Sequence, residues 1–589
     1  MNEVSDELKI IFDRTPDNPN LAYVKVYAPN DAELRRVIGA LYVALSYDND
    51  NVKHSWEYKQ GFSDGKEHLF NKQNQTLPLG LVTRAYKLIR IAVPEIKVEF
   101  AKPIWDAYGN PNGELLQEKI REYCDSLKIY NTEEDFVITP YDHQIRLIDR
   151  AINGRLISLM ACTSAGKSLS QYVISRYLSE VEKHKVLIIV PSSGLVEQMY
   201  RDFHVEYGWV DAPDKMTLIH GTSRDKLSKK KKQMLSELGL GEEAVLRDVV
   251  ISTWQSLSNK DQSFYEVFGA VIVDEAHGSK APELKRIIDS CINANLKIGL
   301  SGTIPEDGLD AALIEGALGR REIIVRTAEL IEKGLLTKTE IIALKLHYRE
   351  DVRRFIGRQD YRNEFELVTG NGSRKQVLDV LLKSKQINED QNTLILFKRK
   401  ESIDVMKEFL EEHYPQYKIL VIKGEVAAST RDKYRQVVNS GTAHIILATY
   451  GTMKQGVNIK FLHNLIFAEF SKSMYEVVQS IGRVVRFHKR KPLARVFDIV
   501  DDASYTTRSR RGGMGNYKMN YAMKHYHERK KYYADDKFPV TEVILPFEAT
   551  IDPEDLDRKK KEAAKKAASR KSKKDSKIVG KGKTSQFLT

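Results

Sequence analysis

Short apolar runs alternate with amphipathic helical stretches from residue 136 to about residue 500, and this alternation predicts parallel β-sheets with crossover helices. A first series of runs comprises LISLMA, KVLIIVP, DVVIST, AVIVDEAH and KIGLSGT. A second series comprises TLILFKRK, KILVIKGE, HIILATY, NLIFAEF and RVFDIVD. We therefore expect two α/β lobes in tandem, over residues 136–325 and 326–505, which divide near 325–345.

The region before the lobes has a mixed pattern, which predicts a small α+β domain over residues 1–105. Alternation at 23–27 indicates a strand, and helical periodicity indicates helices at 31–45 and 77–89. Aromatic and turn-forming residues near 56–70 predict short strands around a turn.

Three further segments complete the chain: a linker helix over 106–135, a helical extension over 506–550 and a lysine-rich tail over 551–589. The tyrosine spacing within 517–533 favours a helix packed on the second lobe over a base-stacking surface. Residues 558–589 carry a net charge of +11 out of +12 for the chain, so the rest is nearly balanced. We expect this tail to be disordered or weakly helical and to bind polyanions by counterion release, although it could simply aid solubility.

Cysteine usage and hydropathy indicate the compartment. The three cysteines, Cys124, Cys162 and Cys291, lie far apart and match neither a disulfide framework nor a zinc-site spacing. No secretory leader and no apolar run long enough to cross a membrane is readable. We expect a cytoplasmic protein in a reducing environment.

The string ACTSAGKS (161–168) predicts a phosphate-binding loop, because it follows an apolar strand and opens a helical pattern. Lys167 would contact the β- and γ-phosphates of ATP, and the Ser168 hydroxyl would bind Mg²⁺. Ala161 stands where the general pattern has its first glycine. The residues expected to hold the nucleotide are Thr163, Ser164, Ala165, Gly166, Lys167 and Ser168.

A second motif, AVIVDEAH, is an apolar strand that ends in acids. Asp274 would hold Mg²⁺ through water, and Glu275 would act as general base on the attacking water. We expect His277 to couple the lobes, together with the hydroxyls of SGT (301–303). Gln144, which lies upstream of the loop, could read the adenine edge because its amide offers both a donor and an acceptor.

The second lobe contributes QSIGRVVR (479–486), in which Arg483 and Arg486 fall on one helical face. These arginines could stabilise charge on the γ-phosphate in the transition state. ATYGTMKQGVNI (448–459) suits a loop that touches nucleotide, through Gly456, and nucleic acid. The order of the motifs predicts an ATPase whose site is closed by two lobes, with nucleic acid as its usual track.

From Pro140 to about Asp502, these motifs resemble, in order, those of the superfamily-2 helicases and translocases. The resemblance implies two RecA-like lobes, with ATP and Mg²⁺ as cofactors. It also implies contacts to the phosphates and sugars of a nucleic-acid strand, with little sequence preference. The residues carried over for these contacts are Pro191, Ser192, Gln198, Thr253, Trp254, Gln255 and Thr449.

The chain is more closely similar to a family of phage recombination helicases, over roughly residues 20–540. Trp56, Asp64-Gly65-Lys66 and LPLGL (77–81) resemble that family's small N-terminal DNA-binding domain, which implies DNA contacts by Trp56 and Lys66. The resemblance implies branch migration, unwinding of branched DNA and of RNA–DNA hybrids, and annealing. It further implies a host bacterial cytosol and phage recombination or single-strand-binding proteins as partners. Two features depart from that family's sequence pattern. One is DEAH, which replaces the family's usual DEC-H form, and the other is the lysine-rich tail.

Other functions remain open at this point. The same motor could act on RNA, or ATP could switch the affinity of a nucleic-acid clamp that displaces no strand. The chain could also be the motor subunit of a restriction or remodelling complex, in which case a partner would supply the nuclease.

Overall fold

The chain divides into two compact units, Met1–Leu336 and Thr337–Thr589, and each is described by itself. This boundary lies within the predicted division at 325–345. The structure, a computed structural model, describes residues 7–109, 116–132, 135–221, 246–370, 372–423, 437, 444–453, 461–508 and 514–549. The predicted lysine-rich tail over 551–589 lies outside the described residues.

The first lobe is built on a seven-stranded parallel sheet in the order β11-β12-β10-β13-β14-β9-β15. Its strands are β9 (Leu156–Ala161), β10 (Val186–Val190), β11 (Met216–Ile219), β12 (Val249–Thr253), β13 (Ala270–Asp274), β14 (Leu296–Ser301) and β15 (Arg320–Val325). The five strands predicted from apolar runs are confirmed. The sequence reading missed the two edge strands, β11 and β15, because β11 is short and β15 begins with charged residues.

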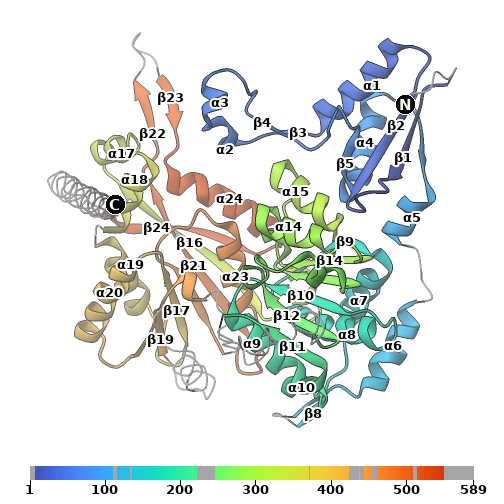
Figure 1. Ribbon diagram of the computed structural model, residues 1–589. Coiled ribbons are helices and arrows are strands. Elements are labelled where there is room, and N and C mark those ends of the chain that lie inside the picture. The colour runs from blue at the N-terminus through green and yellow to red at the C-terminus, as the bar shows by residue number, and fades with distance from the viewer. Residues whose placement is uncertain are drawn as a thin grey trace, which may run out of the picture. The chain divides into compact units, whose positions relative to one another are not determined.

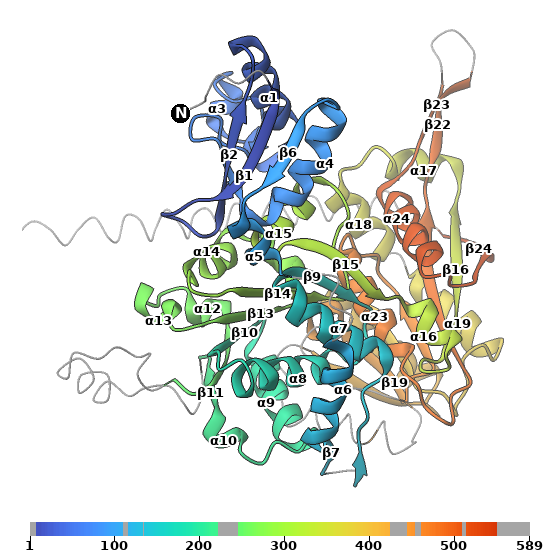
Figure 2. The ribbon, with the colours of Figure 1, turned by 90° about the vertical axis from the view of Figure 1, so that its right-hand side faces the viewer.

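Helices lie on both faces of this sheet (Figures 1 and 2), so its central strands are buried on both sides and read as continuous apolar runs. The helices are α6 (Leu116–Leu127), α7 (Asp142–Gly154), α8 (Lys167–Glu180), α9 (Ser193–Arg201), α10 (Ala212–Lys215), α12 (Trp254–Leu257), α13 (Gln262–Glu266), α14 (Pro282–Ser290), α15 (Gly308–Leu318) and α16 (Thr327–Glu332). A short hairpin, β7 (Tyr130–Asn131) and β8 (Phe136–Val137), precedes α7.

The N-terminal domain has a four-stranded sheet in the order β5-β2-β1-β6. Its elements are β1 (Lys9–Arg14), β2 (Leu21–Tyr27), α1 (Asp31–Ala44), β3 (Ser46–Asp48), α2 (Asp50–Lys53), α3 (Trp56–Lys59), β4 (Lys66–His68), β5 (Thr76–Pro78), α4 (Val82–Ala92), β6 (Lys97–Phe100) and α5 (Lys102–Tyr108). The predicted strand at 23–27 and both predicted helices are present. The prediction of strands around 56–70 is only partly right, because Ser55 caps the short helix α3 by accepting from the backbone N–H of Tyr58.

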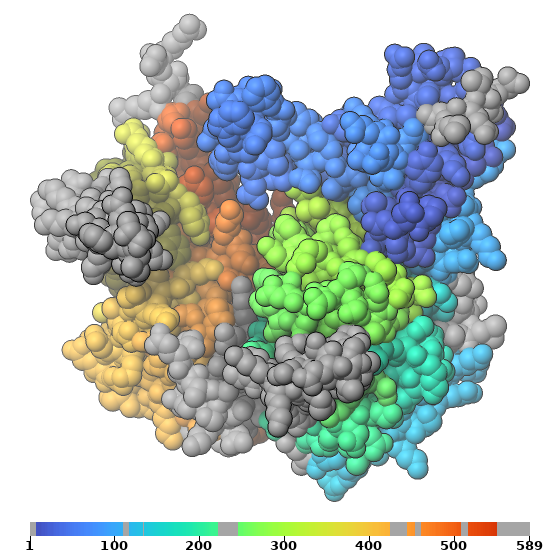
Figure 3. Space-filling model, in the orientation of Figure 1, coloured from blue at the N-terminus to red at the C-terminus, as the bar shows by residue number. Residues whose placement is uncertain are grey.

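The N-terminal domain packs directly on the first lobe, over α14 and α15 (Figures 1 and 3). Its apolar core includes Leu156 from β9 and Ala312 from α15. At the same contact the Arg84 guanidinium donates to Glu315 over 2.6 Å. The shared core joins the domain and the lobe within one unit.

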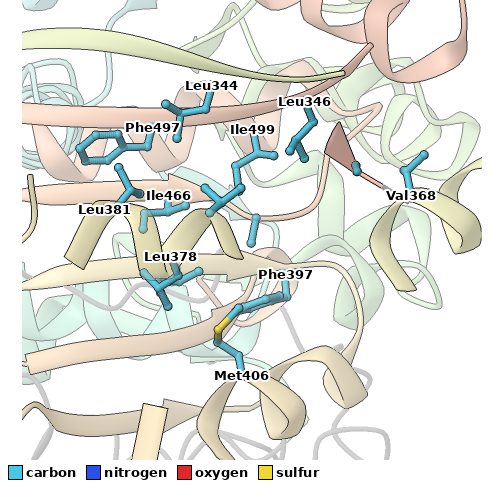
Figure 4. Close-up of a cluster of buried hydrophobic side chains, with 14 of the residues drawn as sticks. Leu344, Leu346, Val368, Leu378, Leu381, Phe397, Met406, Ile466, Phe497 and Ile499 are labelled. Carbon is cyan, nitrogen blue, oxygen red and sulfur yellow. The ribbon is translucent and has the colours of Figure 1, made fainter. Parts of the chain in front are cut away.

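The second unit contains a seven-stranded parallel sheet in the order β18-β19-β17-β20-β21-β16-β24, with a large apolar core (Figure 4). Its strands are β16 (Lys338–Tyr348), β17 (Thr393–Phe397), β18 (Lys418–Ile422), β19 (His444–Thr449), β20 (Asn464–Phe467), β21 (Leu493–Asp502) and β24 (Val540–Ala549). Its helices are α17 (Glu350–Ile356), α18 (Tyr361–Gly370), α19 (Ser373–Lys383), α20 (Lys400–His413), α22 (Tyr450–Met453), α23 (Met474–Val484) and α24 (Tyr521–Asp535).

The predicted helical extension over 506–550 holds only one described helix, α24. It also holds a hairpin of β22 (Tyr505–Arg508) and β23 (Met514–Lys518), as well as β24, which pairs with β16. β24 is an edge strand with mostly exposed side chains, so it lacks the apolar run that marked the other strands. Tyr526 and Tyr533 of α24 are buried, in agreement with the predicted packing on the lobe, whereas Tyr517 lies exposed on β23.

Candidate functional site

The predicted functional residues of the first lobe gather at one edge of its sheet. Strands β12, β10, β13, β14 and β9 are consecutive neighbours and all run parallel, so their carboxyl ends meet there. In open α/β sheets ligands bind outside this edge. The phosphate loop follows β9, the acids end β13, and Ser301 ends β14.

The phosphate loop joins β9 to α8 and has a backbone that few residues can adopt. Gly166 caps α8 with φ +79°, and Ser164 also has a positive φ of 70°. This φ favours glycine at position 166, and a Cβ there would also lie 2.0 Å from Nε2 of Gln144 and displace that side chain. The Lys167 ammonium donates to the carbonyls of Ala161 (3.0 Å) and Cys162 (3.3 Å). The Lys167 side chain therefore stabilises the conformation of the loop.

Gln144 and its neighbour His143 support this loop from α7. The Gln144 side chain donates to the Ala165 carbonyl over 3.2 Å and accepts from the Tyr141 N–H over 2.8 Å. Nε2 of His143 also lies 2.9 Å from the Ala165 carbonyl. Burial lowers the pKa of His143. The adenine contact predicted for Gln144 stays a prediction, since both ends of its amide are engaged by the loop and by α7.

The residues of the loop fit a bound triphosphate and its magnesium ion. The buried Thr163 hydroxyl oxygen is without a hydrogen-bond partner in the described part of the chain. The left-handed backbone at Ser164 and Gly166 is of the kind that turns successive N–H groups into a cradle for phosphate oxygens. Magnesium prefers oxygen ligands, and the Ser168 hydroxyl and the Asp274 carboxylate supply them.

The acids at the end of β13 have different electrostatic environments. Burial raises the pKa of Asp274, with the neighbouring Glu275 charge adding to it, and Oδ1 of Asp274 accepts from Gln171 over 3.0 Å. Burial alone would raise the pKa of Glu275 too, but the hydrogen bond with His277 and the charge of Lys167 bring it below its ordinary value. Glu275 is thus ionised at neutral pH, as a general base must be.

Ser301 connects the acid pair to the end of β14. Its hydroxyl lies 3.2 Å from Oε2 of Glu275 and 3.2 Å from Nδ1 of His277, and it accepts from the Thr303 N–H over 3.2 Å. Glu275 itself has a positive φ of 51°, a strained conformation for a residue with a side chain. The predicted SGT and DEAH motifs are therefore one hydrogen-bonded cluster.

Sequence reasoning missed several residues at this site, among them Gln171, His143 and, of most consequence, Asp202. Its carboxylate accepts from the Ser168 hydroxyl over 2.9 Å, although 33 residues separate the two positions. Asp202 lies in a π-helical turn, Asp202–Glu206, that continues α9. A lone aspartate inside a helical pattern gave no signal in the sequence.

The predicted nucleic-acid contacts of the first lobe lie on the neighbouring strand ends. Val190 of β10 pairs with Thr253 of β12, so the turns that follow these strands are adjacent. Pro191 and Gln255 are exposed, Ser192, Gln198 and Trp254 are half-buried, and Thr253 is buried. The Thr253 hydroxyl accepts from the Ser256 N–H and caps α12, which indicates a structural task for that side chain.

Trp56 and Lys66, the contacts expected from the N-terminal domain, are both exposed on the β3–α2–α3–β4 segment. The Trp56 ring lies 5.9 Å from that of Phe62, which is 77% exposed. The geometry leaves these aromatic faces accessible.

The predicted residues of the second unit differ in exposure. Arg483 on α23 is buried and donates to the Met453 carbonyl, whereas Arg486 just after the helix is half-buried. Thr449 accepts from the Thr452 N–H at the start of α22. Gly456 lies outside the described residues. Of the two arginines, Arg486 is better placed to reach a ligand.

Comparisons with known proteins agree with these motifs. Residues 137–306 match the family model of the type III restriction enzyme res subunit, and residues 373–488 match that of the helicase conserved C-terminal domain. The ATP-dependent DNA helicase uvsW of Enterobacteria phage T4 is 28% identical over 84% of this chain and 93% of its own length. A crystal structure of T4 UvsW is 26% identical, covers 92% of this chain and 99% of its own, and has a TM-score of 0.45.

A more distant relative is the African swine fever virus protein QP509L, which is named as an ATP-dependent RNA helicase. It is 26% identical over 44% of this chain and 52% of its own length. In the part of the chain that the structure describes, no helix is both long and apolar enough to cross a membrane.

Proposed function

We propose that this chain, a superfamily-2 helicase with two RecA-like lobes, is an ATP- and Mg²⁺-dependent motor that remodels branched DNA. One observation carries the proposal. A single sheet edge presents the phosphate loop and the acid pair on β9 and β13, and the turns after β10 and β12 lie on the neighbouring strands. Nucleotide and nucleic acid would then bind to adjacent parts of one rigid layer.

The chain's own residues would divide the work as follows. The backbone of the loop and Lys167 bind the phosphates, while Ser168 and Asp274 orient the magnesium ion. Bound Mg²⁺ neutralises charge that develops on the phosphate oxygens. Glu275, held by Ser301 and His277, accepts the proton of the attacking water. Arg486 is our choice for the residue that stabilises the transition-state charge.

DNA as the substrate is supported by the phage T4 relative, which is named as a DNA helicase and aligns over most of both chains. That the DNA is branched is our inference from the resemblance to phage recombination helicases. The exposed aromatic rings of Trp56 and Phe62 support a DNA-contacting role for the N-terminal domain, because aromatic faces stack on unpaired bases. We infer branch migration, unwinding and annealing, with R-loop removal as a further activity.

A second candidate, an RNA-directed helicase with the same motor, is favoured by the similarity to QP509L. An ATP-switched clamp would share the site but displace no strand. Phage recombination or single-strand-binding proteins remain proposed partners, and the bacterial cytosol the proposed location.

The test is steady-state ATP hydrolysis without nucleic acid and with single-stranded DNA, duplex DNA, a four-way junction and RNA. We expect the four-way junction to stimulate hydrolysis most and Lys167→Ala to abolish it. Lys119→Ala, which removes an exposed lysine on α6 of the same lobe, is the matched control and should hydrolyse like the parent protein. Stimulation by RNA alone would establish the second candidate, and the absence of any stimulation would refute the motor.

A further inference from the structure

Asp202 sits between two functional elements of the first lobe. Helix α9 begins right after Ser192, a predicted nucleic-acid contact, and carries Gln198. It continues without a break into the π-helical turn Asp202–Glu206, whose first side chain accepts the Ser168 proton over 2.9 Å. Isolated π-helical turns are rare and occur frequently at functional sites.

The hydrogen bond between the Ser168 hydroxyl and the Asp202 carboxylate determines how the Ser168 oxygen is oriented. A hydroxyl has one proton to donate and two lone pairs to offer. The Tyr207 hydroxyl is a second side-chain hydrogen-bond partner of Ser168. Because the Ser168 proton goes to Asp202, a lone pair of the oxygen can still be directed at a cation. The other nearby acid, Asp274, accepts from Gln171. Among the described contacts, the proton of the magnesium ligand is therefore directed by Asp202 and not by the acid of the DEAH motif.

A second contact, one helical turn further along α8, holds the same turn in place. The Tyr172 ring packs edge-on against Phe203 at 5.4 Å and lies 5.3 Å from the ring of Tyr207. Tyr172 and Phe203 are both completely buried. Since Ser168 and Tyr172 are four residues apart, they share one face of α8. The π-helical turn is thus attached to α8 at two points, and a shift of α9 would be passed to Ser168.

We propose that Asp202 is a positioning residue that orients the Ser168 hydroxyl for Mg²⁺ and links this ligand to α9. The link to nucleic acid rests on the proposed function, whereas the orientation of Ser168 does not. By reciprocity, magnesium nucleotide and nucleic acid would change each other's affinity through this contact.

The first measurement is the affinity for ADP by calorimetry, with Mg²⁺ and with a chelator, so that no turnover is involved. We expect Asp202→Ala to reduce the strengthening by Mg²⁺ about tenfold, because a hydrogen bond to a charged group is lost, and to leave the affinity in chelator unchanged. Asp202→Asn, whose amide oxygen still accepts the Ser168 proton, should lose less. Glu206→Gln, a neutralised acid on the same turn, is the control and should behave like the parent protein.

A double-mutant cycle shows whether Asp202 acts through Ser168. Asp202→Asn added to Ser168→Ala should cause no further loss in the Mg²⁺ effect, and this comparison remains usable if Asp202→Ala does not fold. A Mg²⁺ effect within twofold of the parent protein in Asp202→Ala, an equal loss in Glu206→Gln, or additive losses in the cycle would each overturn the proposal.

The second measurement is the affinity for fluorescent single-stranded DNA with and without Mg²⁺ and a non-hydrolysable ATP analogue. We expect nucleotide to change this affinity in the parent protein and to have little effect in Asp202→Ala, while the affinity without nucleotide stays equal. A full nucleotide response in the variant would overturn the link to α9. A parent protein that shows no response would instead refute the proposed motor and leave the calorimetric result standing.

Discussion

The two lobes of this chain have the same connectivity but use their buried carboxylates differently. Numbered within each lobe, the strands of both sheets run in the order third, fourth, second, fifth, sixth, first, seventh. In the first lobe Asp274 and Glu275 receive hydrogen bonds from Gln171 and Ser301. These donors are neutral side chains.

In the second lobe the buried acids of β21 are paired with arginines. Arg529 binds Asp498 through two hydrogen bonds of 2.8 Å, and Arg374 binds Asp501 through bonds of 2.8 and 2.5 Å. All four side chains are buried. Such bidentate pairs satisfy both charges and position elements, here α24 and α19, on the sheet.

The different partners of these carboxylates distinguish a functional site in the first lobe from structural ion pairs in the second, within the same fold. In the second lobe each carboxylate is occupied by a bidentate arginine and by one further hydroxyl, that of Tyr533 on Asp498 and that of Tyr348 on Asp501. Asp274 and Glu275 of the first lobe are held instead by Gln171, Ser301 and His277, and their pKa values shift in opposite directions. The role of a buried carboxylate therefore depends on its hydrogen-bonding partners and not on the fold alone.

Neutralising the general base should have the largest effect. We expect Glu275→Gln to lower the maximal rate of ATP hydrolysis by about 10²–10⁴-fold, since proton abstraction is lost, while ATP affinity is retained. Steady-state kinetics together with nucleotide binding measures both. Glu283→Gln, an exposed acid on α14, should leave the rate unchanged. If Glu275→Gln hydrolysed ATP at the rate of the parent protein, the proposed contrast between the acids of the first lobe and the arginine-paired acids of the second lobe would be refuted.

Breaking the ion pair of the second lobe should affect stability instead of chemistry. Arg529→Met leaves Asp498 buried without its cation, and we expect the free energy of unfolding to fall by about 3–5 kcal/mol. Chemical denaturation measures this loss. Lys530→Met, which removes the exposed neighbour paired with Glu542, should cost less than about 1 kcal/mol. An unchanged stability in Arg529→Met would mean that this pair does not hold the lobe together.

Lys297 provides the test with the smallest expected effect. It is a buried charge of the first lobe, its hydrogen-bond partners are neutral, and it lies away from the functional site. Its ammonium donates to Asn20 of the N-terminal domain (2.5 Å) and to the Ile288 carbonyl (2.9 Å). Burial lowers the pKa of Lys297 to about 8. The folded state therefore releases this proton before the unfolded state does, and the penalty of the buried charge is relieved as the pH rises above 8.

The lowered pKa of Lys297 predicts how the stability of the protein depends on pH. Between pH 7.5 and 9.5 the free energy of unfolding of the parent protein should rise by on the order of 1–2 kcal/mol relative to that of Lys297→Met. Denaturation at several pH values measures the difference between the two proteins. A constant difference across this range would show that Lys297 is neutral, or solvated, throughout.

Much of the fold was readable along the chain. Ten strands were marked by apolar runs such as VLIIV (186–190), because a parallel sheet covered on both faces requires continuous apolar residues. Four strands of the two sheets, β11, β15, β16 and β24, escaped detection. β11, β15 and β24 lie at edges, where the apolar pattern is short or weak, whereas the interior strand β16 alternates buried and half-buried residues and so lacks a continuous apolar run.

The site was readable where its chemistry is local and unreadable where it depends on distant contacts. Asp274 ends a strand, and Gly166 and Lys167 lie in the loop after one, so their place at the sheet edge could be predicted. The contact between Asp202 and Ser168 could not, because it arises only when a π-helical turn packs on α8. Arg483 had the right spacing for a phosphate ligand but is buried against Met453.

Two α/β lobes, a phosphate loop, an acid pair and the order in which they occur could all be inferred from the amino-acid sequence. These features depend on backbone conformation and strand periodicity, which neighbouring residues control. Which buried charges can take part in chemistry depends on contacts that form only when the chain is folded. A charge deep in a protein takes its behaviour from the groups folded against it, and for Asp202, Asp498 and Lys297 those groups come from other parts of the chain.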